Sequence, residues 1–330
     1  MIVKLFSFFW ILMNVVDTFP RKKYNFNVPC EVKRTVLNPM AYSMVHLDWL
    51  MNSRQDPEVR PGLYQGDIAM TNEDYNYLRV GLRWDVFSNR MWKNRIVPYV
   101  ISPLYRAPEY IKILKTLIYL KSMTCINFVP RDKFARDYII FEPTHNPDGC
   151  WSYIGKIGGA QLVSLEPPDN IKQNCFNGQG FIIHEVLHAL GIFHEQSRAD
   201  RDNFVNIHYE NIIPGNLYNK LIFYVIFFCQ LKFINLNITG ELVNFRKESL
   251  ENTTYSYEYD YHSIMHYGSF SFSIDRLRKP TITSKIPGIT VGQRENMTKT
   301  DCLKVNKLYG CLDDPSEAKK WNAICSTLEI

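Results

Sequence analysis

The sequence lacks the features that define several large classes of protein. It contains no internal repeat and no low-complexity tract, which excludes repeat architectures and biased disordered segments as its main content. Its basic residues are scattered rather than clustered with aromatic ones, and its net charge is only +5, so we expect no nucleic-acid partner. The N-terminal apolar run, residues 5–16, is short for a membrane span, and we expect no stable membrane association.

What is present fits a folded, exported chain. Its 330 residues are 46% hydrophobic and 22% charged, which is a globular composition. The apolar run follows a single Lys, so residues 1–18 are predicted to be a signal peptide. No clear small-residue cleavage site follows, which leaves an uncleaved anchor as the alternative. Eight cysteines and three N-x-T sequons favour an extracellular, oxidising location; the sequons begin at Asn237, Asn252 and Asn296.

The most informative stretch is HEVLHALGIFH, residues 184–194. His184 and His188 are four residues apart, so on a helix they lie on one face and can bind one zinc ion. Gly191 tolerates a positive φ, so the chain can turn sharply there and bring His194 to the same ion. Three protein ligands leave a fourth position open, as in catalytic zinc sites. The other interpretation is a core helix with satisfied histidines, but the fixed offsets of Gly191 and His194 make it the weaker one.

A second motif, SIMHYG at residues 263–268, strengthens this interpretation. In metzincin metalloproteases, the long zinc-binding motif is followed by a methionine turn beneath the metal. Met265 is the candidate for that methionine, although in isolation it would be taken for an ordinary buried side chain.

Together these motifs closely resemble the astacin family of zinc endopeptidases. The resemblance rests on FIIHEVLHALGIFHEQSRADRD and SIMHYG, and its distinguishing positions are Glu195 and Tyr267. Further matches run from Trp92 to Cys311 and comprise IVPYV, TCINFVPR, GCWSYIG, GQR and LYGC. The resemblance covers about residues 63–311. It implies an α+β fold of the metzincin type, with two lobes, a twisted mixed sheet and a long zinc-binding helix.

The resemblance also implies roles for individual residues. The three histidines hold one Zn²⁺, which lowers the pKa of bound water to about 7. Glu185, next to the first histidine, acts as the general base on that water. Tyr267 is a further zinc ligand that swings away to stabilise the transition state. In isolation Tyr267 would be assigned a structural role, because the chain has 20 tyrosines.

Residues 19–82 are expected to be a propeptide that inhibits its own enzyme. They include YQGDI, residues 64–68, which is similar to an astacin propeptide segment whose Asp binds the zinc in place of water. Asp67 is therefore the candidate latency switch, because a carboxylate oxygen is a good zinc ligand; the alternative is a plain Gly-Asp turn. Activation requires cleavage near residues 78–83, whose arginines suit a trypsin-like protease. The resemblance implies that the new N-terminus then contacts Glu195.

The pairing of the eight cysteines is not fixed by their spacing. The resemblance implies two disulfides, Cys125–Cys311 and Cys150–Cys175. The other four cysteines have no implied partner: Cys30, Cys229, Cys302 and Cys325. Cys302 lies in an expected C-terminal helix, where we predict a buried free thiol.

Hydrophobic periodicity places the expected elements of the peptidase domain, residues 83–311, which a short tail follows at residues 312–330. Strands are expected at residues 96–101, 137–143 and 160–167, and helices at residues 107–123, 178–191 and 298–309. In astacins an extended substrate pairs with an edge strand of the sheet, and we expect that edge just after Trp151.

Residues 220–244 do not fit this pattern. Their flanks join into astacin-like sequence without them, and their composition shifts abruptly to Phe, Ile, Leu, Asn and Lys. We predict an insertion or a translated intron, and its apolar part is far too short for a membrane span.

The sequence thus predicts a secreted zinc metalloendopeptidase, made as a zymogen, that cleaves proteins or peptides. One alternative is a catalytically impaired, secreted binding or matrix protein on the same fold, against which the intact Glu185 argues. The other is a membrane-anchored form. Arg294 is either a selector of acidic substrate side chains or a structural surface residue.

Overall fold

A computed structural model describes part of the chain. It covers residues 57–59, 63–71, 74, 90–144, 147–168, 174–213, 244–248 and 257–328. The predicted signal peptide, the cleavage segment at residues 78–83 and all of residues 220–244 except Asn244 lie outside the described residues, as do Cys30 and Cys229. Among the helices that are described, none is both long and apolar enough to cross a membrane.

A six-stranded mixed sheet has the strand order β1-β5-β6-β4-β2-β3. Its strands are β1 (Ile68–Ala69), β2 (Ile96–Ile101), β3 (Asn127–Pro130), β4 (Tyr138–Phe141), β5 (Trp151–Tyr153) and β6 (Ala160–Ser164). Strands β6, β4, β2 and β3 pair in parallel, whereas β5 is antiparallel to β6 and β1 is parallel to β5. All three expected strands are present, as β2, β4 and β6.

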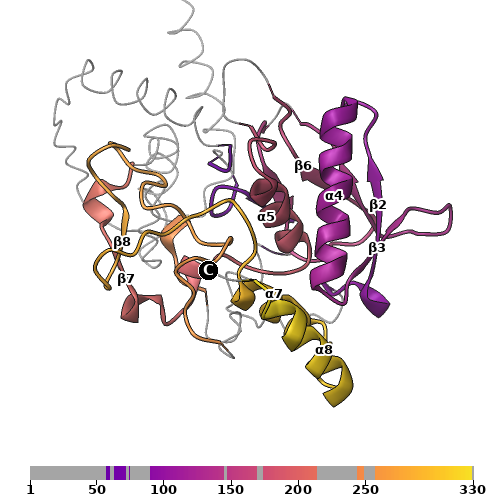
Figure 1. The fold of residues 1–330 in the computed structure, drawn as a ribbon. Helices are drawn as coiled ribbons and strands as arrows, with labels where there is room; N and C mark the ends of the chain where they lie inside the picture. The colour runs from indigo at the N-terminus through magenta and orange to yellow at the C-terminus, as the bar shows by residue number, and fades with distance from the viewer. Residues whose placement is uncertain are drawn as a thin grey trace, which may run out of the picture. The chain divides into compact units, whose positions relative to one another are not determined.

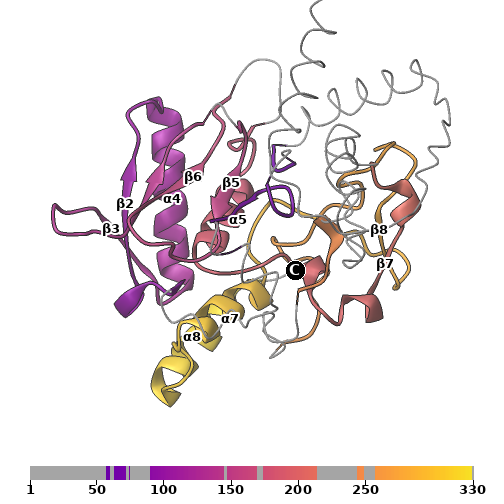
Figure 2. The ribbon, with the colours of Figure 1, turned by 180° about the vertical axis from the view of Figure 1, so that it is seen from behind.

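Two helices pack against each other and against this sheet (Figure 1, Figure 2). The first, α4 (Ala107–Met123), buries Ile113, Leu117 and Leu120, whose spacing makes one apolar stripe. The second, α5 (Gln179–Ala189), is buried along almost its whole length, which carries its two histidines into the interior. Both helices lie where the periodicity predicts them.

The chain after α5 consists mostly of turns. Its two strands, β7 (Val205–Ile207) and β8 (Ile282–Ser284), pair antiparallel in a separate sheet. The short 3-10 helices of the described chain are η3 (Lys93–Arg95), η4 (Glu195–Ser197), η5 (Arg201–Asn203) and η6 (Tyr209–Asn211). Because few regular elements order this region, specific polar contacts must fix its loops.

The helix α7 (Lys299–Leu308) fixes one of these loops. It begins with a capping box, in which the side chains of Thr298 and Asp301 each accept a backbone N–H from the other residue. Asp301 also accepts a hydrogen bond from the Ser263 hydroxyl at 2.6 Å and from the Ile264 N–H at 2.9 Å. The start of α7 therefore holds the segment that leads to Met265.

The region after Cys311 is not a simple tail. It forms α8 (Pro315–Cys325), whose first turn is capped by Asp314 and whose Trp321 is buried. Cys302 in α7 forms a disulfide with Cys325. The prediction of a free thiol at Cys302 is therefore wrong. The helix α8 packs beside α7 and brings the two sulfurs together, which the sequence spacing did not reveal.

Candidate zinc site

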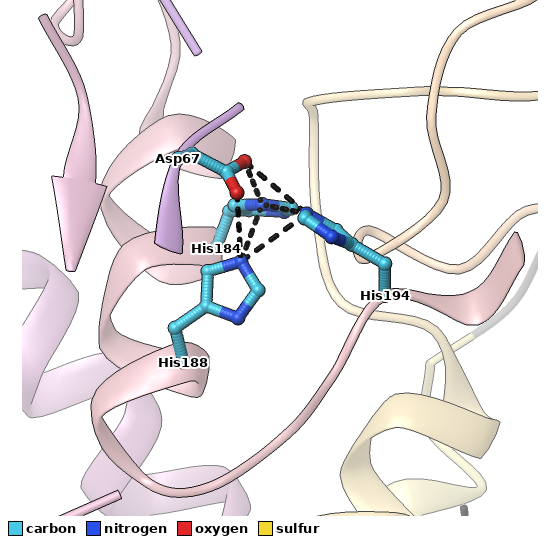
Figure 3. A group of neighbouring side chains, drawn as sticks. All are labelled: Asp67, His184, His188 and His194. Atoms are coloured by element: carbon cyan, nitrogen blue, oxygen red, sulfur yellow. Dashed lines mark hydrogen bonds and ion pairs between the residues drawn. The ribbon is translucent and has the colours of Figure 1, made fainter. Parts of the chain in front are cut away.

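The helix α5 and the turn after it bring three histidines together (Figure 3). His184 and His188 are buried side chains one turn apart. The chain leaves the helix at Gly191, whose φ of 101° favours glycine and whose N–H bonds to the carbonyl of His188. The turn directs the chain back, so that the ring of His194 faces the other two rings.

Four potential ligand atoms face one another across a small volume. The Nε2 atom of His188 lies 3.1 Å from that of His184 and 3.2 Å from that of His194, and the remaining pair is 3.3 Å apart. The Oδ2 atom of Asp67 lies 3.2 Å from Nε2 of His184 and 3.1 Å from Nε2 of His194. Tetrahedral zinc with ligands at roughly 2.0–2.1 Å sets its ligand atoms about 3.3 Å apart, so this spacing fits the ion.

The outer nitrogens of the first two rings are held by the backbone of the peptidase domain. Nδ1 of His184 donates to the carbonyl oxygen of Ile264 at 2.8 Å. Nδ1 of His188 donates to the carbonyl oxygen of Ile192, also at 2.8 Å. A partner on Nδ1 fixes the direction of each ring, so that each Nε2 faces the shared volume.

The third ring has a different partner. Nδ1 of His194 donates to the side-chain oxygen of Gln65 at 2.9 Å. Burial lowers the pKa of His184 and of His194 to about 3, so both rings are neutral at physiological pH. The Nε2 atoms of these two rings therefore have no proton between them, and the contact of 3.3 Å that joins them is not a hydrogen bond. Converging lone pairs of this kind need a cation, and the donor set is one that zinc prefers.

Glu185 projects into the same region. It is fully buried, and neither carboxylate oxygen has a hydrogen-bond partner among the described residues. A carboxylate oxygen lies within 4.8 Å of a ring nitrogen of His184. Burial, and then the negative charges of Asp67 and Glu58, raise the pKa of Glu185 well above its ordinary value. A buried carboxylate without such partners is costly, and such groups occur where acid–base chemistry needs them.

The turn at residues 263–268 supports the site from one side. Met265 is buried, and its carbonyl accepts the N–H of Glu195 at 3.0 Å. The ring of Tyr267 lies 4.7 Å from the ring of His194, measured between centroids. The Tyr267 hydroxyl donates to the main-chain oxygen of Gln65. In this arrangement the carboxylate of Asp67 faces the three ring nitrogens, and Tyr267 is held beside the site by Gln65.

Asp67 immediately precedes the edge strand β1. Its neighbour β5 donates the N–H of Ser152 to the Asp67 carbonyl at 3.0 Å. Gly66 has a φ of 83°, and a Cβ there would lie 2.7 Å from the ring of Phe272 and 2.9 Å from the Glu58 carbonyl. Glycine is therefore required in YQGD. The strand β1 thus occupies the edge of β5 at which we expect a substrate.

Sequence reasoning did not single out several residues that hold this strand. The Tyr64 hydroxyl donates to Glu248 at 2.5 Å, and the Gln65 side-chain amide donates to the same carboxylate at 3.2 Å. Gln65 lies two residues before Asp67, and that proximity was the only available signal. Nothing in the sequence near Glu248 points to the site.

Arg294 is more deeply placed than a surface residue, because its side chain is only 12% exposed. Its Nε donates to both carboxylate oxygens of Glu58, at 2.7 and 2.9 Å, and Nη1 donates to the carbonyl of His266 at 2.9 Å. Gly292, two residues earlier, has a φ of 87°, and a Cβ there would lie 2.2 Å from the Cα of Gly268. The GQR motif thus packs directly on the methionine turn.

Glu195 lies in a buried network of charges. Its carboxylate accepts from Lys304, from Arg198 at 3.2 Å and from the N–H of Asp260 at 3.0 Å. Burial opposes ionisation, but Lys304 and Arg198 outweigh it and hold the pKa of Glu195 below its ordinary value. Groups of the peptidase domain therefore already satisfy this carboxylate.

Two disulfides join distant parts of the domain. Cys125 pairs with Cys311, and Cys150 pairs with Cys175. The second of these ties β5 to the loop before α5. It lies next to the prosegment, because the Cys150 N–H donates to the carbonyl of Pro57 at 2.8 Å.

A zinc-binding helix, a third histidine after a glycine turn and a methionine turn define a metzincin-type metallopeptidase fold. The family model described as Astacin, a peptidase family, matches residues 86–222 and 230–310. The chain therefore belongs to the astacin family.

Individual relatives agree with this assignment. The chain is 33% identical over 246 residues to zinc metalloproteinase nas-12 of Caenorhabditis elegans, covering 73% of this chain and 55% of that protein. It is 30% identical to nas-13 of the same organism, covering 93% of this chain and 64% of that protein. A hatching enzyme zinc-protease of Oryzias latipes, high choriolytic enzyme 1, has a similar structure. Its TM-score is 0.53 at 33% identity, covering 68% of this chain and 96% of that one. The chain spans little more than half the length of the two curated relatives.

Proposed function

We propose that this chain is the zymogen of a secreted zinc metalloendopeptidase that hydrolyses peptide bonds in proteins. One observation carries the proposal: Asp67, from the segment ahead of the matched family domain, completes a three-histidine site beside the buried carboxylate of Glu185. A structural zinc site would use four protein ligands but would need no unpartnered buried carboxylate beside them, so Glu185 is the feature that favours catalysis.

Removal of the prosegment would expose the elements that the reaction needs. When bound, Zn²⁺ polarises the scissile carbonyl and lowers the pKa of water to about 7. Glu185 takes a proton from the attacking water and later returns it to the leaving amine. Tyr267, released from the Gln65 carbonyl, donates its hydroxyl hydrogen to the developing oxyanion. An extended substrate replaces β1 at the free edge of β5.

The proposed processing follows the predicted domain order. Residues 1–18 direct export, residues 19–82 inhibit, and a trypsin-like protease cleaves near Arg79 or Arg83. The new N-terminus then reaches Glu195, where it must join or displace Lys304. The three disulfides of the described residues favour an oxidising compartment. Residues 220–244 remain proposed as an insertion or retained intron; abundant mature transcript that contains them would contradict the intron.

Peptide hydrolysis by the trypsin-treated chain tests the proposed activity. We expect cleavage that a zinc chelator abolishes and added zinc restores. Glu185→Gln should lower kcat by about 10²–10⁴-fold, because it removes the base and leaves the three ligands in place. Zinc content, measured on the same samples, should not change. Cleavage by the variant at the unsubstituted rate would refute the role of Glu185.

A further inference from the structure

A second carboxylate of the prosegment lies in the site, nine residues before Asp67. Glu58 is buried, with 8% of its surface exposed. Its two oxygens accept hydrogen bonds from Nε of Arg294, and Nη2 of Arg294 lies 2.7 Å from one of them. A two-pronged contact between a planar guanidinium and a carboxylate is the strongest kind of ion pair in proteins, and burial reduces its screening by water.

This ion pair lies beside the reacting groups. A Glu58 oxygen, a ring nitrogen of His184 and a carboxylate oxygen of Glu185 all lie within 4.8 Å of one another. The prosegment therefore places two acidic side chains at the site: Asp67 on the three histidines, and Glu58 next to the proposed base. Arg294 belongs to the peptidase domain. Its positive charge offsets the cost of burying the negative charge of Glu58.

The backbone around Glu58 is held at the same place. The Pro57 carbonyl accepts the N–H of Cys150 at 2.8 Å, immediately before β5. The Glu58 carbonyl lies so close to Gly66 that a Cβ at Gly66 would approach it to 2.9 Å. The segment of residues 57–59 thus packs between β5 and the YQGD turn, and its anchors differ from those of Asp67.

We propose that Glu58 is a second lock of the latent enzyme, which fills a cationic subsite at Arg294 next to Glu185 and anchors the prosegment independently of Asp67. This proposal rests on the proposed latency of the chain. It adds that the prosegment is fixed at two points of different chemistry, one at the metal ligands and one at a guanidinium. Full activation must release both, so loss of Asp67 alone should activate the chain only in part.

Hydrogen exchange in the full-length chain reports on each lock separately. The Cys150 N–H is protected by Pro57, beside Glu58, whereas the Ser152 N–H is protected by the Asp67 carbonyl. Glu58→Gln should speed exchange at Cys150 by about ten- to a hundredfold, because it removes the negative charge that pairs with Arg294. The same substitution in an Asp67→Ala background should also speed exchange at Cys150, because Arg294 pairs with Glu58 whether or not Asp67 is present.

Glu210→Gln is the matched control. It makes the same chemical change at an exposed carboxylate that belongs to the peptidase domain. We expect no change at Cys150 in this variant. If Glu58→Gln leaves exchange at Cys150 equal to that of Glu210→Gln, the second lock is refuted.

A second substitution and an activity assay complete the test. If Glu58→Gln does not fold, Glu58→Asp retains the charge but shortens the side chain, so it should give an intermediate increase; exchange equal to the unsubstituted chain would refute the proposal. The exchange measurement requires no peptidase activity. A trypsin-treated chain that cleaves no peptide would therefore contradict the proposed peptidase activity. The exchange measurement would still test the role of Glu58.

Discussion

The three histidines are held by two different parts of the molecule. His184 and His188 donate Nδ1 to backbone carbonyls of Ile264 and Ile192, which belong to the peptidase domain. His194 donates Nδ1 to the side-chain oxygen of Gln65, which belongs to the proposed prosegment. The first arrangement is permanent, because both partners are buried in the same domain core. The second would be lost if the proposed prosegment were removed.

This difference shows how one scaffold can be both rigid and switchable. The permanent framework fixes the direction of two ligands, as partners behind the ligands do in metal sites generally. The proposed prosegment supplies the carboxylate of Asp67 that faces the histidines, the partner of the third histidine and the acceptor for Tyr267. A single segment therefore controls three features of the site at once.

Asp67→Ala should have the largest effect on activity of the uncleaved chain. Loss of a buried, charged ligand removes the contact that blocks the fourth position, so peptidase activity of the uncleaved chain should rise about a thousandfold. The trypsin-treated form should be unaffected, because its prosegment is gone. Initial rates on a fluorogenic peptide, before and after trypsin, measure both. Full latency of the variant would refute the switch.

Tyr267→Phe tests a residue of the peptidase domain whose hydroxyl contacts Gln65. Its hydroxyl can stabilise an oxyanion only in the transition state, so kcat of the trypsin-treated form should fall about a hundredfold while KM changes little. In the uncleaved chain the substitution removes the hydrogen bond to Gln65. A rise in KM with kcat unchanged would show that Tyr267 acts in binding instead.

The features predictable from the sequence were those that chemistry fixes locally. The offsets among His184, His188, Gly191 and His194 follow from helix geometry and from the need to turn the chain, and the structure has both. The apolar stripe of α4 is likewise local. The sequence also led to Asp67, but only through a resemblance.

What was missed depends on contacts across long stretches of chain. Glu58 contacts Arg294, Tyr64 contacts Glu248, and Cys302 forms a disulfide with Cys325, which lies in a helix where the sequence predicts a short tail. None of these pairs has a spacing that physical chemistry dictates. Only the fold brings them together, so periodicity and motif chemistry do not reveal them.

Two disulfides allow the framework to be tested region by region. Cys302–Cys325 and Cys150–Cys175 close loops of similar length, with sequence separations of 23 and 25. Replacing either pair with Ser should therefore cost about 3 kcal/mol of unfolding free energy. Thermal unfolding should show a similar loss of stability for both variants.

Their effects on latency should differ. Cys150 lies beside the prosegment contact with Pro57, so its loss should also raise activity of the uncleaved chain, whereas loss of Cys302–Cys325 should not. Equal latency in the two variants would mean that the β5 edge does not depend on its disulfide.

Gln65→Leu should have the smallest effect. It directly tests the difference between the support of His194 and that of the other two histidines. The substitution removes the acceptor for Nδ1 of His194 but leaves the partners of His184 and His188 untouched. Loss of such an outer partner typically weakens metal affinity by about tenfold or more. Zinc transfer from the uncleaved chain to a chromogenic chelator should therefore be about tenfold faster than in the unsubstituted chain. After trypsin treatment the two chains should release zinc at the same rate, because neither retains residue 65. A difference that persists after cleavage would place the effect of Gln65 in the peptidase domain and would contradict the conditional support of His194.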